Sequence, residues 1–99
     1  MNKYPEEIEA LKKAVELNPN YADAYCNMGV GYMNMGQYKE AVEVLKKSIT
    51  IQPAFWRGHF NLGLTYVCLG NKEMAMEEHK ILKGLNPQMA EKLLAEINK

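Results

Sequence analysis

The 99-residue sequence lacks the features that mark several classes of protein. It has no run of 18 apolar residues, and its start, MNKYPEEIEA, is not a signal peptide, so nothing indicates membrane insertion or secretion. Basic and acidic residues both number 12, and the zero net charge argues against electrostatic binding to nucleic acid or an anionic membrane. We therefore expect a small cytoplasmic protein with neither of these partners.

Residues suited to chemistry are also few. Cys26 and Cys68 show no metal or redox spacing, which predicts reduced and buried thiols. His59 and His79 are joined by no further histidine or acid at ligand spacing. No paired carboxylates, nucleophile–base set or phosphate-binding glycine loop stands out. The sequence therefore predicts a protein that is not an enzyme and has neither cofactor nor metal.

What the sequence does contain is a repeat with a period of 34 residues. The stretch Tyr21–Pro53 recurs after that shift, and Pro19, Pro53 and Pro87 are equally spaced. The identical pairs are Asn27 and Asn61, Gly29 and Gly63, Tyr32 and Tyr66, Gly36 and Gly70, Ala41 and Ala75, Glu43 and Glu77, and Lys46 and Lys80. A fixed period of this length indicates an array of stacked supersecondary units.

The spacing of apolar residues predicts helices over residues 5–17, 22–35, 38–51, 56–69 and 72–83 and from about residue 88. Gly36 is expected to end the second helix in a left-handed conformation, and Gly70 and Gly84 to end the fourth and fifth. The helices over 22–35 and 56–69 carry one charge each, Asp23 and Arg57. A helix with so little charge is covered on both sides or lines a groove.

These residues resemble the tetratricopeptide repeat when Pro53 and Pro87 take its position 32. The signature positions are then Tyr25 and His59, Met28 and Leu62, Gly29 and Gly63, Tyr32 and Tyr66, Ala41 and Ala75, and Leu45 and His79. The departures are His59, where a large aromatic residue is usual, and Ser48 and His79 at packing positions.

The resemblance implies an all-α fold, a right-handed α-α superhelix of helix-turn-helix repeats with terminal half-repeat helices. It divides a single domain, residues 1–99, into a half-repeat (1–19), two repeats (22–55 and 56–89) and a C-terminal capping helix (88–99). At the packing position of Ala41 and Ala75 the half-repeat has Glu7, which is expected to be harmless because this second helix has lost the first helix of its repeat.

In this family the first helix of each repeat lines a concave groove that binds peptide segments of partner proteins. The resemblance therefore implies a non-catalytic protein-interaction module, an adaptor or scaffold. The candidate groove residues are Asn27, Val30, Met33, Asn34, Arg57, Phe60, Asn61 and Leu64. The two asparagines would bind a ligand backbone, since an amide both donates and accepts. The alternative is that the apolar residues pack between repeats and that Arg57 is solvated or ion-paired.

The family's carboxylate clamp, which holds the acidic C-terminal motif of chaperones, is not expected here. Its lysine and asparagine positions in a first repeat are taken by Cys26 and Val30. A second hypothesis is self-association, because Ile8, Leu11 and Val15 lack the helix that would normally cover them. Such an end could form a homodimer. His59 and His79 are expected to lie close together inside the second repeat.

Overall fold

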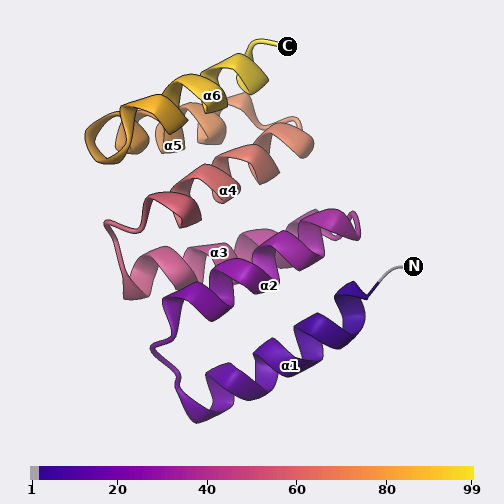
Figure 1. The fold of residues 1–99 in the computed structure, drawn as a ribbon. Helices are drawn as coiled ribbons and strands as arrows, with labels where there is room; N and C mark the ends of the chain where they lie inside the picture. The colour runs from indigo at the N-terminus through magenta and orange to yellow at the C-terminus, as the bar shows by residue number, and fades with distance from the viewer. Residues whose placement is uncertain (1–2) are drawn as a thin grey trace.

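The computed structural model describes residues 3–99 as a stack of six α-helices without a strand in that range (Figure 1). The helices are α1 (Tyr4–Leu17), α2 (Ala22–Asn34), α3 (Tyr38–Ile51), α4 (Trp56–Cys68), α5 (Lys72–Leu85) and α6 (Pro87–Ile97). The sequence predicted each of them to within two residues at either end. The expectation that Gly84 ends the fifth helix is wrong, because α5 continues through it to Leu85.

Two glycines end the first helix of each repeat in the same way. Gly36 and Gly70 have φ values of +75° and +76°, the left-handed region that side chains with a Cβ rarely adopt. The following amides, of Gln37 and Asn71, donate to carbonyls within the preceding helix, both at 2.8 Å. No atom lies within 4 Å of the place of a Cβ at either glycine. Glycine is therefore required by the backbone conformation and not by a lack of room for a side chain. The predicted left-handed cap at Gly36 is confirmed.

The helices pack as antiparallel pairs, α2 with α3 and α4 with α5. In the first pair the backbones approach closely, since a Cβ at Gly29 would lie 2.5 Å from Leu45 Cγ. Helix α1 packs on α2, and α3 packs on α4. The chain thus builds an all-α superhelix in chain order from α1 to α6, as the repeat spacing predicted (Figure 1).

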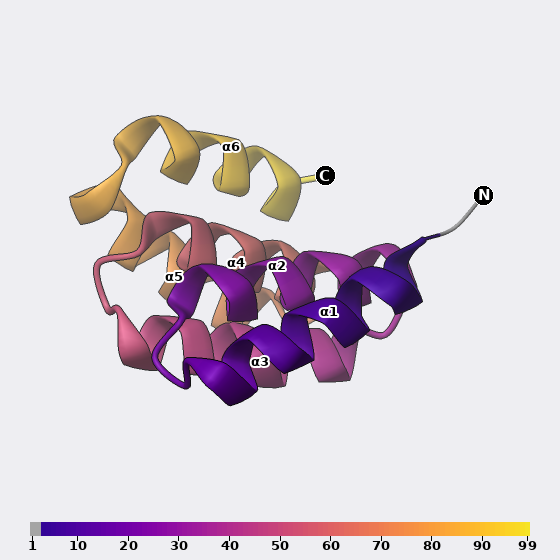
Figure 2. The ribbon, with the colours of Figure 1, turned by 60° about the horizontal axis from the view of Figure 1, so that its bottom comes forward.

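Helix α6 closes the C-terminal end of the stack by packing on both α5 and α4. Figure 2 shows it above α4, on the side away from α3. Leu93 of α6 is fully buried, and a Cβ at Gly63 would lie 2.5 Å from its Cδ2 atom. Leu93 therefore packs on Gly63 as Leu45 packs on Gly29. The repeat register would assign this contact to His79, which corresponds to Leu45.

The N-terminal end is covered less completely. Ile8, which was expected to be exposed for self-association, is only 4% exposed and packs against Gly31, 3.1 Å from the place of a Cβ there. That expectation is therefore wrong for Ile8, because α2 has a glycine where the side chain lands. Leu11 and Val15 remain half-buried.

Each helix in the described part of the chain falls short of the length and apolar content that a membrane span needs. The polar departure at Ser48 is satisfied inside the fold, because its buried hydroxyl donates to the Ala22 carbonyl at 2.8 Å. That bond ties the end of α3 to the start of α2, so the position contributes a hydrogen bond in place of apolar packing.

Candidate functional site

The predicted groove residues on α2 differ in exposure. Asn27, Val30 and Asn34 are exposed, with Val30 at 37%, whereas Met33 is half-buried and packs against the core. Cys26, one position before Asn27, is only 2% exposed. Helix α2 therefore has one side under α4 and another open to solvent.

The predicted groove residues on α4 are more covered. Phe60, Asn61 and Leu64 are half-buried, and the two apolar residues pack against the core. Arg57 is exposed but paired, because its Nη2 donates to Asp23 Oδ1 of α2 at 2.8 Å. Its guanidinium also lies 5.0 Å from the centre of the Phe55 ring. Both partners of the ion pair are about half-exposed, so it contributes little stability but neutralises this part of the groove.

The two asparagines at the same repeat position have different surroundings. Asn61 Nδ2 donates to Cys26 Sγ at 3.4 Å, across from α4 to α2. Burial is the main cause that raises the pKa of the Cys26 thiol above its ordinary value of 9.0, while the Asn61 hydrogen bond opposes it. Asn27 makes no corresponding side-chain hydrogen bond within residues 3–99 and instead lines a cleft between α1 and α2. The pair is thus not one equivalent ligand clamp in this structure.

A cleft between α4 and α6 includes Phe60 and Leu64 from the predicted set. Its other lining residues are Lys92, Ala95 and Glu96, all from α6. Glu96 pairs with Lys99 at 2.9 Å, while Lys92 has no ion-pair partner among residues 3–99. Reasoning from the sequence did not include α6 in the site. The repeat register contained a signal, since a shift of 34 places Ala95 in line with Asn61.

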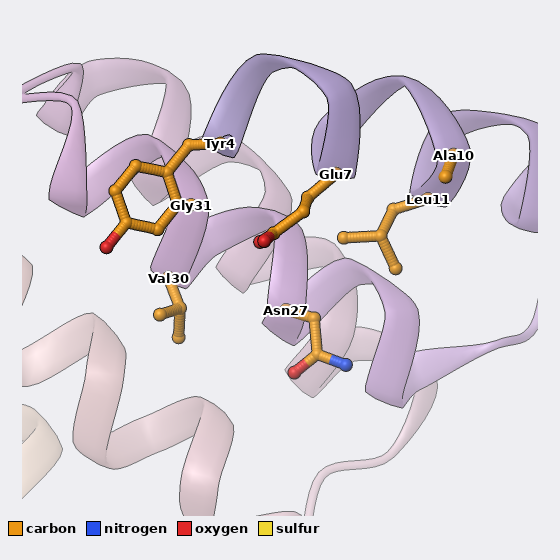
Figure 3. A pocket seen from close by; sticks show the side chains of 7 residues that line it. All are labelled: Tyr4, Glu7, Ala10, Leu11, Asn27, Val30 and Gly31. Atoms are coloured by element: carbon orange, nitrogen blue, oxygen red, sulfur yellow. The ribbon is translucent and has the colours of Figure 1, made fainter. Parts of the chain in front are cut away.

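A second cleft, of about 420 Å³, lies between α1 and α2 (Figure 3). Its lining residues are Tyr4, Glu7, Ala10, Leu11, Asn27, Val30 and Gly31. Two predicted groove residues, Asn27 and Val30, belong here and not to the cleft that holds Phe60 and Leu64. The structure therefore places four of the eight predicted residues in two clefts at opposite ends of the stack, whereas Met33, Asn34, Arg57 and Asn61 line neither cleft.

The polar groups suited to chemistry are buried or isolated. His59 is 5% exposed, and its Nδ1 lies 2.7 Å from Glu78 Oε1 and its Nε2 2.7 Å from the Pro53 carbonyl oxygen. The hydrogen-bonding partner of His59 on α5 is thus Glu78, which was not among the residues singled out from the sequence. The expected closeness of His59 and His79 stays a prediction. No group of three or more potential metal ligands occurs within residues 3–99.

The two thiols also differ from expectation. Cys26 is buried as predicted, but Cys68 is exposed at the end of α4. The prediction of a buried Cys68 is wrong because the residue falls on the last turn of its helix, where no helix covers it. It points to no site by itself.

Comparison with known families identifies the repeat. A model described as TPR repeat matches residues 1–36, and one described as tetratricopeptide repeat matches residues 22–55, so together they span residues 1–55. With the helix pairs and turns described above, this chain belongs to the tetratricopeptide repeat family. No curated protein sequence matches this chain.

Several solved structures share the fold. The first TPR of Spaghetti (RPAP3) bound to HSP90 peptide SRMEEVD has a TM-score of 0.91 at 18% identity, covering 97% of this chain and 78% of that one. The second TPR domain of human RPAP3, in complex with HSP70 peptide SGPTIEEVD, has a TM-score of 0.90 at 21% identity, covering 98% and 82%. At these identities the likeness shows the fold alone. MamA is 33% identical with a TM-score of 0.83, covering 91% of this chain, which spans 53% of the MamA chain.

Proposed function

We propose that this chain is a non-catalytic interaction module that binds a peptide or protein segment on its concave face, formed by α2, α4 and α6. The observation that carries the proposal is the cleft between α4 and α6. Phe60 and Leu64 provide an apolar wall there, and Lys92 and Glu96 provide a charged edge. A cleft with apolar walls and a few polar groups at its edge suits one apolar side chain of an extended segment.

The electrostatics of this face favour apolar and hydrogen-bonding contacts over charge. Arg57 is already neutralised by Asp23, and Asn61 is partly engaged with Cys26. The bound peptides of the two RPAP3 domains support a peptide-binding role for this fold. We further place the module in the cytoplasm, a compartment that suits two cysteines without a disulfide.

The ligand class differs from that of the RPAP3 domains. Those peptides both end in the acidic sequence EEVD. Here Cys26 is buried and Val30 is apolar at positions where the family's clamp has a cation and an amide. We expect neither SRMEEVD nor SGPTIEEVD to saturate this chain at about 1 mM in calorimetry, which corresponds to less than about 4 kcal/mol of binding free energy.

The direct test uses a displayed library of random peptides, selected on the wild-type chain and then measured by calorimetry. Ala95 is exposed and lines the cleft, so Ala95→Trp fills the cleft without removing a core side chain. Gln88→Trp on an exposed position of the same helix, outside the cleft lining, is the matched control. We expect at least a tenfold loss of affinity for Ala95→Trp and none for Gln88→Trp.

Both variants must keep the wild-type helical signal in circular dichroism for the comparison to hold. Selected peptides that bind Ala95→Trp as tightly as wild type would place the site elsewhere. Tight binding of SRMEEVD would instead retain the concave face as a site but contradict its proposed preference for apolar ligands.

A further inference from the structure

The cleft between α1 and α2 corresponds to a position that a helix occupies elsewhere in this chain. In repeat register α1 matches α3 and α5, and α2 matches α4. Helix α3 contacts both α2 and α4, and α5 contacts both α4 and α6, whereas α1 contacts only α2 within residues 3–99. The cleft therefore has the same position relative to α1 and α2 that helix α2 has relative to α3 and α4.

The lining residues agree with this correspondence. Leu11 matches Leu45, which is fully buried and packs on α2. Asn27 matches Asn61, whose amide reaches a buried thiol of α2. Two positions that a helix covers in the next repeat thus face the cleft here. A helix is the element whose shape fits this surface.

One lining residue departs from the pattern and sets the charge of the occupant. Glu7 takes the position of Ala41 and Ala75, both 0% exposed. Its side chain is exposed, has no ion-pair partner within residues 3–99, and projects from α1 into the cleft (Figure 3). A helix lying here would bury this carboxylate, which is costly unless a cation pairs with it. The occupant must therefore bring a lysine or arginine to Glu7.

A second copy of this chain fits these features poorly. Ile8 is already buried within its own chain. A two-fold contact would place two Glu7 carboxylates in one interface, because such an interface uses the same surface twice. A head-to-tail contact would use α6, which has no large exposed apolar residue within its described range.

We propose that the cleft between α1 and α2 docks an amphipathic helix of a partner protein. The apolar side of that helix lies against Leu11 and Val30, and a lysine or arginine lies beside Glu7. The docked helix extends the stack by one element in register. This site is separate from the cleft between α4 and α6 and does not depend on the function proposed above.

The probe is a stapled helical peptide that copies residues 22–35, because α2 occupies the equivalent position one repeat later; Cys26→Ala in the peptide prevents oxidation. In the antiparallel α2–α3 pair, Gly29 faces Leu45, so residue 32, one turn later in α2, faces Ala41. A peptide docked in the same way on α1 therefore places its position 32 against the residue of α1 that matches Ala41. Helix α1 has Glu7 at that position. Two peptides are therefore compared, one with Tyr32→Lys and one with Tyr32→Glu.

We expect the wild-type chain to bind the lysine peptide at least tenfold more tightly than the glutamate peptide in fluorescence anisotropy. Glu7→Lys in the protein should reverse that preference, since the charge beside position 32 changes sign. Glu6→Lys makes the same change of charge on an exposed position of α1 outside the cleft lining, and it should keep the wild-type preference. Ala95→Trp should leave both affinities unchanged, which separates this site from the concave cleft.

Three results would overturn the proposal. The first is no binding of either peptide at about 1 mM. The second is the same peptide preference in Glu7→Lys as in wild type. The third is a wild-type chain that is dimeric by light scattering and becomes monomeric in Leu11→Glu, which would assign the cleft to a second copy.

Discussion

Helices α1 and α6 both end the stack, yet they cover their neighbours very differently. Helix α6 contacts α4 and α5 and buries Leu93 and Ile97, whereas α1 contacts α2 alone in the described chain and leaves Leu11 half-buried. A terminal helix therefore closes a repeat stack when its side chains reach two neighbouring helices. A helix that reaches one neighbour leaves a cleft on its other side.

The connections that precede α4 and α6 differ in length. Residues 52–55 join α3 to α4, but Asn86 alone joins α5 to α6. Helix α6 consequently begins at Pro87, three residues before the register position that corresponds to Trp56. Leu93 of α6 lies over Gly63 of α4. Helix α6 thus supplies the side chain that α5 lacks at His79.

The largest expected effect concerns the buried pair of His59 in α4 and Glu78 in α5. A carbonyl oxygen can only accept a hydrogen bond, so His59 Nε2 donates to the Pro53 carbonyl oxygen. A second hydrogen bond joins His59 Nδ1 to Glu78 Oε1. Glu78→Ala leaves Nδ1 unpaired in a buried site and should lower the free energy of unfolding by about 3–5 kcal/mol. Glu78→Gln should lose only about 1 kcal/mol, because its amide can donate to Nδ1 while Nε2 still donates to Pro53.

Urea unfolding of the two variants measures this difference. The first repeat has Tyr25 and Val44 at the corresponding positions, so the pair is a feature of the closed end only. Equal losses for Glu78→Ala and Glu78→Gln would show that the hydrogen bond to Nδ1 does not stabilise the fold.

A pair of leucine truncations compares the two ends directly. Leu93→Ala removes a fully buried side chain over Gly63 and should lower the free energy of unfolding by about 3 kcal/mol. Leu11→Ala removes a half-buried side chain that lines an open cleft and should lower it by less than about 1 kcal/mol. Urea unfolding of both variants measures the two losses. A loss for Leu11→Ala as large as that for Leu93→Ala would mean that the α1 surface is covered in solution.

The smallest expected effect tests the covered side of α2. Burial raises the pKa of the Cys26 thiol above 9.0, so the unfolded chain loses this proton at a lower pH than the folded chain. The stability that this thiol contributes is therefore complete below about pH 9.0 and is lost as pH rises through the folded pKa. The slope is at most about 1.4 kcal/mol per pH unit.

Unfolding of wild type, Cys26→Ala and Cys68→Ser between pH 8 and 10 isolates this contribution. Cys26→Ala should show a shallower fall of stability with pH, while Cys68→Ser, at an exposed position, should follow wild type. A thiol reagent should also label Cys68 much faster than Cys26 in the folded chain. Equal labelling rates would contradict a closed contact between α2 and α4.

The helices and turns were predictable because their signals are local. Gly36 and Gly70 end α2 and α4 at the predicted places, since positive φ is a property of single residues. The neighbour of His59 was not predictable in the same way. Register arguments placed His79 near it, but the residue of α5 that hydrogen-bonds it is Glu78, and a rotation of one position changes which side chain a helix buries. The contact of Leu93 with Gly63 depended equally on how α6 packs on α4.

The candidate site shows the same limit. All eight predicted residues lie on α2 and α4, as the charge pattern indicated. The α6 residues of the cleft between α4 and α6 were missed, and Glu7 was expected only to be harmless. A cleft is made by residues from two helices. The contribution of the second helix depends on its tilt and offset, which cannot be predicted from composition and spacing.

By itself, the sequence determined the all-α class, the order of the helices and the repeat register, because apolar spacing and glycine positions act over a few residues of chain. Only the tertiary structure decided which sides of those helices are covered. Asn27 and Asn61 hold the same position in two repeats, yet Asn61 donates to Cys26 of α2, and Asn27 lines a cleft. The reason is that, within residues 3–99, α4 packs against the complete pair α2–α3, whereas the only earlier helix that α2 contacts is α1.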